Sequence, residues 1–132
     1  MKILELTDLH VYYGKIHALK GINIEIHQGE IVTLIGANGA GKSTTLRAIS
    51  GLIPPSQGNV FFKDKMIVGL PPAQITSFGI VQVPEGRRIF SRLTVLENLE
   101  MGAYLIKDKK TIQTDMKQVF EYFPILRERQ VQ

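Results

Sequence analysis

The clearest chemical signal in this sequence is one run of nine residues, Gly36-Ala37-Asn38-Gly39-Ala40-Gly41-Lys42-Ser43-Thr44. This run fits the pattern G-x-x-x-x-G-K-[ST] without a mismatch. Its glycines allow backbone conformations that a Cβ would forbid, so successive N–H groups can turn inward around an anion. The lysine can then reach the terminal phosphates of a nucleotide, and the serine hydroxyl can ligate Mg²⁺. The pattern predicts a phosphate-binding loop; a glycine-rich turn without a ligand is the alternative.

A phosphate-binding loop needs a strand before it and a helix after it. Residues 31–35 form a short apolar run, which is typical of a buried strand. Residues 43–50 place Leu46 and Ile49 on one face, as a helix would. The N-terminus of that helix adds unpaired N–H groups and the positive end of its dipole, which both favour an anion.

The segment before the loop predicts an antiparallel sheet. Apolar residues alternate from Ile3 to Tyr13, and the phase of this alternation changes at Thr7-Asp8, which indicates a bulged strand. Residues 22–26 alternate strictly between isoleucine and polar side chains, as in a half-buried strand. His10, His17 and His27 show no metal-ligand spacing and are interpreted as solvated or half-buried strand residues.

Further elements are expected after the loop. Residues 59–62 and 66–68 predict a short hairpin, and a proline at 71 or 72 can start a short helix that ends at Gly79. Residues 80–83 predict another buried strand, which Pro84 ends.

The C-terminal third of the sequence predicts helices. Thr94 and Glu97 match a capping box at the start of a helix over residues 95–104. A second helix carries an apolar stripe that we interpret as packing surface, and Pro124 ends it. The residues of that stripe are Ile112, Met116, Val119, Phe120 and Phe123.

Composition limits the possible classes of protein. The 132 residues are 44% hydrophobic, which suits one globular domain, and no apolar run approaches the roughly 20 residues that span a bilayer. There is no cysteine, which excludes disulfides and is consistent with a cytosolic protein. The net charge is +4, but the basic residues are scattered, so nucleic acid is not expected as a partner.

Several segments taken together resemble the ATP-binding subunits of ABC transporters. They are Tyr13-Gly14, Ala18-Leu19, Gly29-Glu30, the loop from Gly36 to Thr44, and Thr94-Val95-Leu96-Glu97-Asn98-Leu99. Within that superfamily, residues 83–94 resemble the LivF type of ATP-binding subunit, which serves branched-chain amino-acid importers. The loop is shared by the whole superfamily, whereas residues 83–94 carry the more specific signal.

The resemblance implies an α/β fold, a P-loop NTPase of the ABC ATPase type. It implies an N-terminal antiparallel β subdomain, a parallel core strand followed by the P-loop helix, and the start of a helical subdomain. We expect residues 1–93 to form the nucleotide-binding core and residues 94–132 to begin the helical subdomain. The family's Leu-Ser-Gly-Gly-Gln signature, Walker B strand and switch histidine do not occur in the sequence. We therefore expect the N-terminal part of a longer, truncated ATPase.

The resemblance also assigns roles to individual residues. Tyr13 would stack on adenine, with an ordinary strand tyrosine as the alternative. Lys42 and Glu85 would be catalytic, and Ser43 and Glu85 would hold Mg²⁺. Most ABC ATPases have glutamine at the position of Glu85, and the neighbouring arginines 87 and 88 can either pair with this carboxylate or face a membrane subunit. The residues expected to bind ATP are Tyr13, Gly36, Asn38, Gly39, Ala40, Gly41, Lys42, Ser43, Thr44 and Thr45.

The function implied by the resemblance is the ATP-binding part of an importer that energises amino-acid uptake, of the branched-chain class. Its partners would be ATP with Mg²⁺, membrane-spanning permease subunits, and a second ATP-binding subunit in a head-to-tail dimer. It would be cytoplasmic and peripheral on the inner face of the membrane. We expect binding of Mg-ATP without the motifs needed for hydrolysis. The alternatives are a non-catalytic module whose residues 85–99 dock on a membrane subunit, and another P-loop NTPase or kinase.

Overall fold

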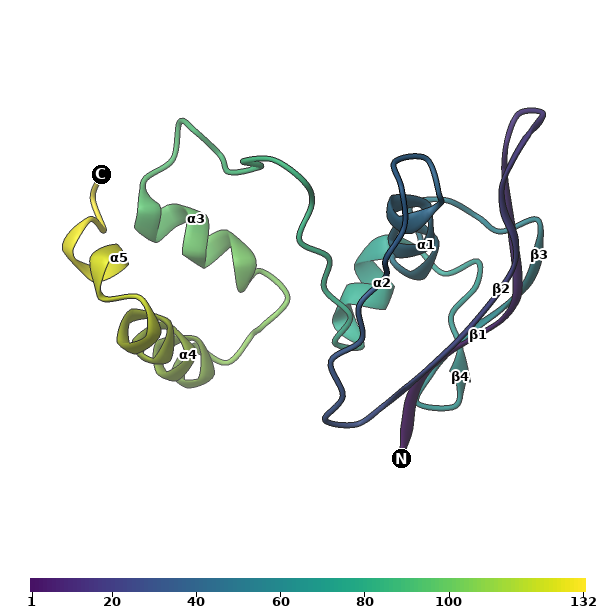
Figure 1. Cartoon of the computed structure of the whole chain (residues 1–132). Coiled ribbons are helices and arrows are strands. Elements are labelled where there is room, and N and C mark those ends of the chain that lie inside the picture. Colours follow the sequence, from purple (N-terminus) through teal and green to yellow (C-terminus); the bar gives the residue numbers. More distant parts are fainter. The chain divides into compact units, whose positions relative to one another are not determined.

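The computed structural model describes residues 1–132 and divides into two compact units, Met1–Val83 and Pro84–Gln132 (Figure 1). The first unit contains β1 Lys2–Tyr13, β2 Ile16–His27, α1 Lys42–Ile49, β3 Gln57–Phe62, β4 Lys65–Met66 and α2 Pro72–Ser77. The second unit contains α3 Val95–Gly102, α4 Lys109–Tyr122 and α5 Pro124–Glu128. The expected division after residue 93 stays a prediction.

The first unit is built on an antiparallel sheet with the strand order β2-β1-β3-β4. The alternation predicted the antiparallel strands before the loop, but not the pairing of β1 with β3. The predicted bulge in β1 is confirmed, because the register shifts between Leu6 and Leu9 and Asp8 has a φ of 46°. At the bulge, the backbone of β3 lies unusually close to the backbone of β1. A Cβ on Gly58 would lie 2.2 Å from the carbonyl oxygen of Asp8, so only glycine fits there.

Helices α1 and α2 cover one face of the sheet and form the core with it (Figure 1). The bulge changes which β1 residues point inward, so Leu6, Leu9 and Val11 are all buried on that face. The rest of the core comes from β2, α1, β3 and the region of α2. These residues are Leu19, Ala48, Val60, Ile67 and Ile75.

The buried strand predicted over residues 31–35 is not formed. No strand is present there, and Ile31 and Ile35 are 97% and 93% exposed. A strand is stabilised by hydrogen bonds to a neighbouring strand, and the strands of this chain pair only as β2-β1-β3-β4. The prediction of a strand over residues 80–83 is wrong for the same reason, and Val83 is largely exposed.

The second unit confirms the capping box that the sequence predicts. Thr94 Oγ1 accepts from the Glu97 amide at 3.2 Å, and a Glu97 carboxylate oxygen accepts from the Thr94 amide at 2.7 Å. The helix ends at Gly102, two residues before the expected end. α4 carries the predicted stripe and buries Phe120, while Phe123 at the end of the stripe is exposed.

Helix α5 was not predicted. Pro124 ends α4 as expected, but it also stands in the first turn of a further short helix, because proline has no N–H and loses nothing there. No helix in this structure has both the length and the apolar character needed to cross a membrane.

Candidate phosphate-binding site

The predicted loop runs directly into α1, and its last glycine forms the helix start. Gly39 and Gly41 have φ of 85° and 99°, a region that residues with a Cβ rarely adopt. Gly41 is the N-cap of α1, makes no side-chain capping bond, and is followed by a first turn without an acidic residue. Glycine at the N-cap therefore offers no side-chain oxygen to the amides of the first turn, and no carboxylate of that turn opposes a bound anion.

Lys42 turns back over the loop that precedes it. Its ammonium group donates to the carbonyl oxygen of Gly36 and, at 3.3 Å, to that of Ala37. An ammonium group has three N–H donors, so these bonds orient the charge over the loop and leave a donor for a phosphate oxygen. Both bonds are made inside the loop, so the position of the charge is fixed by the loop itself.

The hydroxyl residues after Lys42 make different contacts. Thr45 is buried, and its hydroxyl donates to the Gly41 carbonyl oxygen at 2.8 Å, which uses its only proton. Thr44 is also buried, and its hydroxyl lies 3.2 Å from the hydroxyl of Tyr13. Ser43 is exposed at the helix start, as is Asn38 in the loop. The predicted phosphate contacts of these residues stay predictions.

Tyr13 stands at the end of β1 and is 40% exposed, so its ring is only partly covered. Its pKa is lowered, first by the hydrogen bond with Thr44 and further by Arg47, against an opposing effect of burial. Arg47 lies on α1, so the cation and the phenol come from different elements. The structure thus brings the predicted adenine-stacking residue into contact with the helix that starts at the predicted phosphate loop.

Glu85 lies in the second unit, whereas Lys42 and Ser43 lie in the first. The Arg88 side chain donates from Nε to the backbone carbonyl oxygen of Glu85 at 3.3 Å. This contact holds Arg88 against the backbone that carries the carboxylate. The predicted metal pair of Ser43 and Glu85, and the catalytic role of Glu85, stay predictions.

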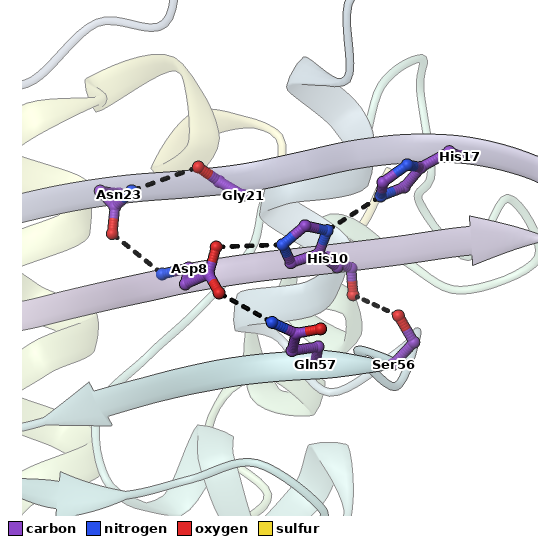
Figure 2. Close-up of polar contacts among 7 residues, drawn as sticks. All are labelled: Asp8, His10, His17, Gly21, Asn23, Ser56 and Gln57. Atoms are coloured by element: carbon purple, nitrogen blue, oxygen red, sulfur yellow. Dashed lines mark hydrogen bonds and ion pairs between the residues drawn. The ribbon is translucent and has the colours of Figure 1, made fainter.

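A polar cluster that the sequence did not reveal links β1 and β2 (Figure 2). Asp8 Oδ1 lies 3.0 Å from His10 Nε2, and His10 Nδ1 lies 2.9 Å from His17 Nε2. The His17 ring also stacks on Tyr12, with ring centroids 4.1 Å apart. The sequence does contain a signal that could have predicted this cluster, namely the short Gly14-Lys15 turn. A tight hairpin places residues on either side of its turn close to one another on the two strands.

β3 joins the same cluster. The side-chain amide of Gln57 donates to Asp8 Oδ2 at 2.8 Å, and the hydroxyl of Ser56, the residue before β3, donates to the His10 carbonyl oxygen at 3.2 Å (Figure 2). The pKa of Asp8 is lowered, first by the bond to His10 and then by that from Gln57. The chain holds no group of three or more histidine, cysteine or acidic residues that could bind a metal ion. The contacts that make up this cluster are hydrogen bonds.

The sheet, the glycine loop at the start of α1 and the lysine over it are together typical of a P-loop nucleotide-binding domain. The family model of the ABC transporter matches residues 19–131. The chain therefore belongs to the ABC transporter family, and the predicted fold class of a truncated ABC ATPase is confirmed except for its parallel core strand, which is not formed.

Two of the curated relatives are ATP-binding proteins of branched-chain amino acid transport. The chain is 49% identical to the high-affinity branched-chain amino acid transport ATP-binding protein BraG of Pseudomonas aeruginosa, over 96% of this chain and 54% of that protein. It is 35% identical to the probable LivF protein of Archaeoglobus fulgidus, over 95% of this chain and 52% of that protein. The chain thus spans about half the length of these curated relatives.

Solved structures agree on the fold. A nucleotide-free ATP-binding cassette from an ABC transporter aligns with a TM-score of 0.84 at 28% identity, over 100% of this chain and 57% of that one. An ATP-binding cassette in its ADP conformation aligns with a TM-score of 0.80 at 28% identity, over 98% of this chain and 57% of that one.

Proposed function

We propose that this chain is the ATP-binding part of an ABC importer ATPase that energises the uptake of branched-chain amino acids. The observation that carries the proposal is the glycine loop that runs into α1 through Gly41, with the Lys42 ammonium group held over it. Phosphates are the anions that this arrangement suits. The identity to BraG supports the choice of substrate class.

The residues that would hold the nucleotide come from two places in the first unit. The backbone amides from Gly36 to Thr45 would surround the phosphates, with Lys42 at the terminal ones, and the Tyr13 ring would stack on the base. The Ser43 hydroxyl is a hard oxygen donor, which suits Mg²⁺ when phosphate oxygens supply further ligands. Glu85 would approach the same metal ion. The metal neutralises charge on the phosphates when it is bound.

The wider setting follows from the relatives. We propose that the protein works at the inner face of the cell membrane, peripheral and cytoplasmic, on permease subunits. A second ATP-binding subunit would complete a head-to-tail dimer. Turnover by these 132 residues is expected to be slow, because the signature, Walker B and switch-histidine motifs through which the family closes the site and orients water do not occur in them.

Calorimetric titration with Mg-ATP tests this function. Wild type should bind, and Lys42→Ala should weaken binding about 10- to 100-fold, because a charge-assisted contact to phosphate is lost. Lys15→Ala, on an exposed lysine of the β1–β2 turn, is the matched control and should bind as wild type does. Absence of binding by a chain that melts cooperatively would refute the proposal. Unchanged binding by Lys42→Ala would refute the assigned site.

A further inference from the structure

The β1–β2 hairpin contacts the start of α1 at two points. Tyr13 and Thr44 are 31 positions apart in the sequence, and their hydroxyl oxygens are 3.2 Å apart. The second point is Gly41, where a Cβ would lie 2.7 Å from Leu19 Cδ2 and 3.1 Å from the Ala18 carbonyl oxygen. The end of the loop is therefore packed on the hairpin, and a hydrogen bond joins the same two elements at Tyr13.

Either of the two hydroxyls can be the donor in this bond. A hydroxyl has one proton and can accept further hydrogen bonds. The bond with Thr44 is the largest cause of the lowered pKa of Tyr13, and Arg47, on the same helix, lowers it further. When Tyr13 donates, Thr44 keeps its own proton for another acceptor.

The bond also limits where the Tyr13 ring can go. The ring is partly exposed at the end of a strand, so packing alone holds it only in part. Thr44 is buried on α1, so its hydroxyl is a fixed anchor. A ring that is already held by a hydrogen bond loses less conformational entropy when it packs on a ligand.

We propose that the Tyr13 hydroxyl is a positioning group that, through its bond to Thr44, sets the ring at a fixed distance from the phosphate loop. The consequence is a preference for a triphosphate that carries a base over the bare triphosphate. This inference rests on the proposed nucleotide binding and concerns the phenol oxygen, separately from the stacking of the ring.

The test compares two ligands, Mg-ATP and Mg-tripolyphosphate, by calorimetric titration. Tyr13→Phe keeps the ring and removes the hydroxyl; it should weaken Mg-ATP about 3- to 10-fold and leave Mg-tripolyphosphate within about twofold, since the lost bond is a single neutral one. Tyr12→Phe is the matched control, because Tyr12 is the preceding residue of β1 and its ring stacks on His17. It should change neither affinity.

Thr44→Val gives a second, independent measurement. If the two hydroxyls act through each other, Tyr13→Phe should cost much less Mg-ATP affinity in the Thr44→Val background than in wild type. Two results overturn the inference while the proposed function stands: Mg-ATP affinity unchanged in Tyr13→Phe, or both ligands weakened equally. If the wild-type chain folds but binds neither ligand, both the proposed function and this inference are refuted.

Discussion

Two stretches of the first unit whose sequences favour strands lie in opposite environments. Residues 4–11 of β1 pair with β2 and β3, and Leu9 is completely buried. Residues 31–35 are richer in isoleucine, leucine and valine, yet they form no strand and Ile35 is 93% exposed. The difference is not in the side chains but in the partners, because β1 has a strand on each side and residues 31–35 have none in this chain. Apolar character makes a strand possible, and a neighbouring strand makes it form.

The largest expected difference between the two stretches is in amide hydrogen exchange. Amides of β1 that bond to β2 and β3 open only with the sheet, so they should exchange at least about 1,000-fold more slowly than those of residues 31–35. Mass spectrometry of peptides from the two stretches measures this. Equal protection would show that residues 31–35 are paired in solution, for example with another copy of the chain.

Truncating one side chain in each stretch should change the free energy of unfolding by very different amounts. Leu9→Ala removes a fully buried side chain and should lower the free energy of unfolding by about 3 kcal/mol. Ile35→Ala removes an exposed one and should change it by less than about 0.5 kcal/mol. Denaturant unfolding followed by circular dichroism gives both values. A large effect of Ile35→Ala would place that residue in a core.

Glycine substitutions should sharpen the same comparison at the backbone. A Cβ on Gly58 would meet the Asp8 carbonyl oxygen at 2.2 Å, whereas one on Gly29, just before the unpaired stretch, would have nothing within 4 Å. Both glycines have positive φ. Gly58→Ala should therefore cost about 3 kcal/mol and Gly29→Ala about 1 kcal/mol. Similar melting temperatures of the two variants would contradict the close packing of β3 on the bulge.

The sequence predicted those features that depend on nearby residues. The phase change at Thr7-Asp8 predicted the bulge of β1, and Thr94 with Glu97 predicted the start of α3. The glycine spacing predicted the loop and its helix. Each of these signals is local, because it comes from alternation, capping or glycine conformations within a few residues.

The features that sequence reasoning missed depend on distant pairing. Residues 31–35 carry the pattern of a buried strand, but the pattern does not say whether a partner strand is present. The bond between Tyr13 and Thr44 joins residues 31 positions apart, and only the packing of the hairpin on α1 brings them together. The contact of His10 with His17 depends on the hairpin register, which a one-residue slip would destroy.

The smallest effect concerns the charge at the bulge, where Asp8 bonds to His10 and Gln57 and so joins β1 to β3. These bonds lower the pKa of Asp8 from its ordinary 3.8, so the carboxylate is more acidic in the folded chain than in the unfolded one. Its contribution to stability is present above pH about 4 and is lost as the pH falls through the lowered pKa.

Asp8→Asn should therefore flatten the loss of stability below pH about 4, and Asp115→Asn, at an exposed position of α4, is the matched control. Thermal melts of wild type and both variants between pH about 2 and 7 measure the slopes. If stability falls with pH in the same way in wild type and Asp8→Asn, the hydrogen bonds at the bulge do not lower the pKa of Asp8. The polar contacts between β1 and β3 would then add little to the apolar packing that distinguishes β1 from residues 31–35.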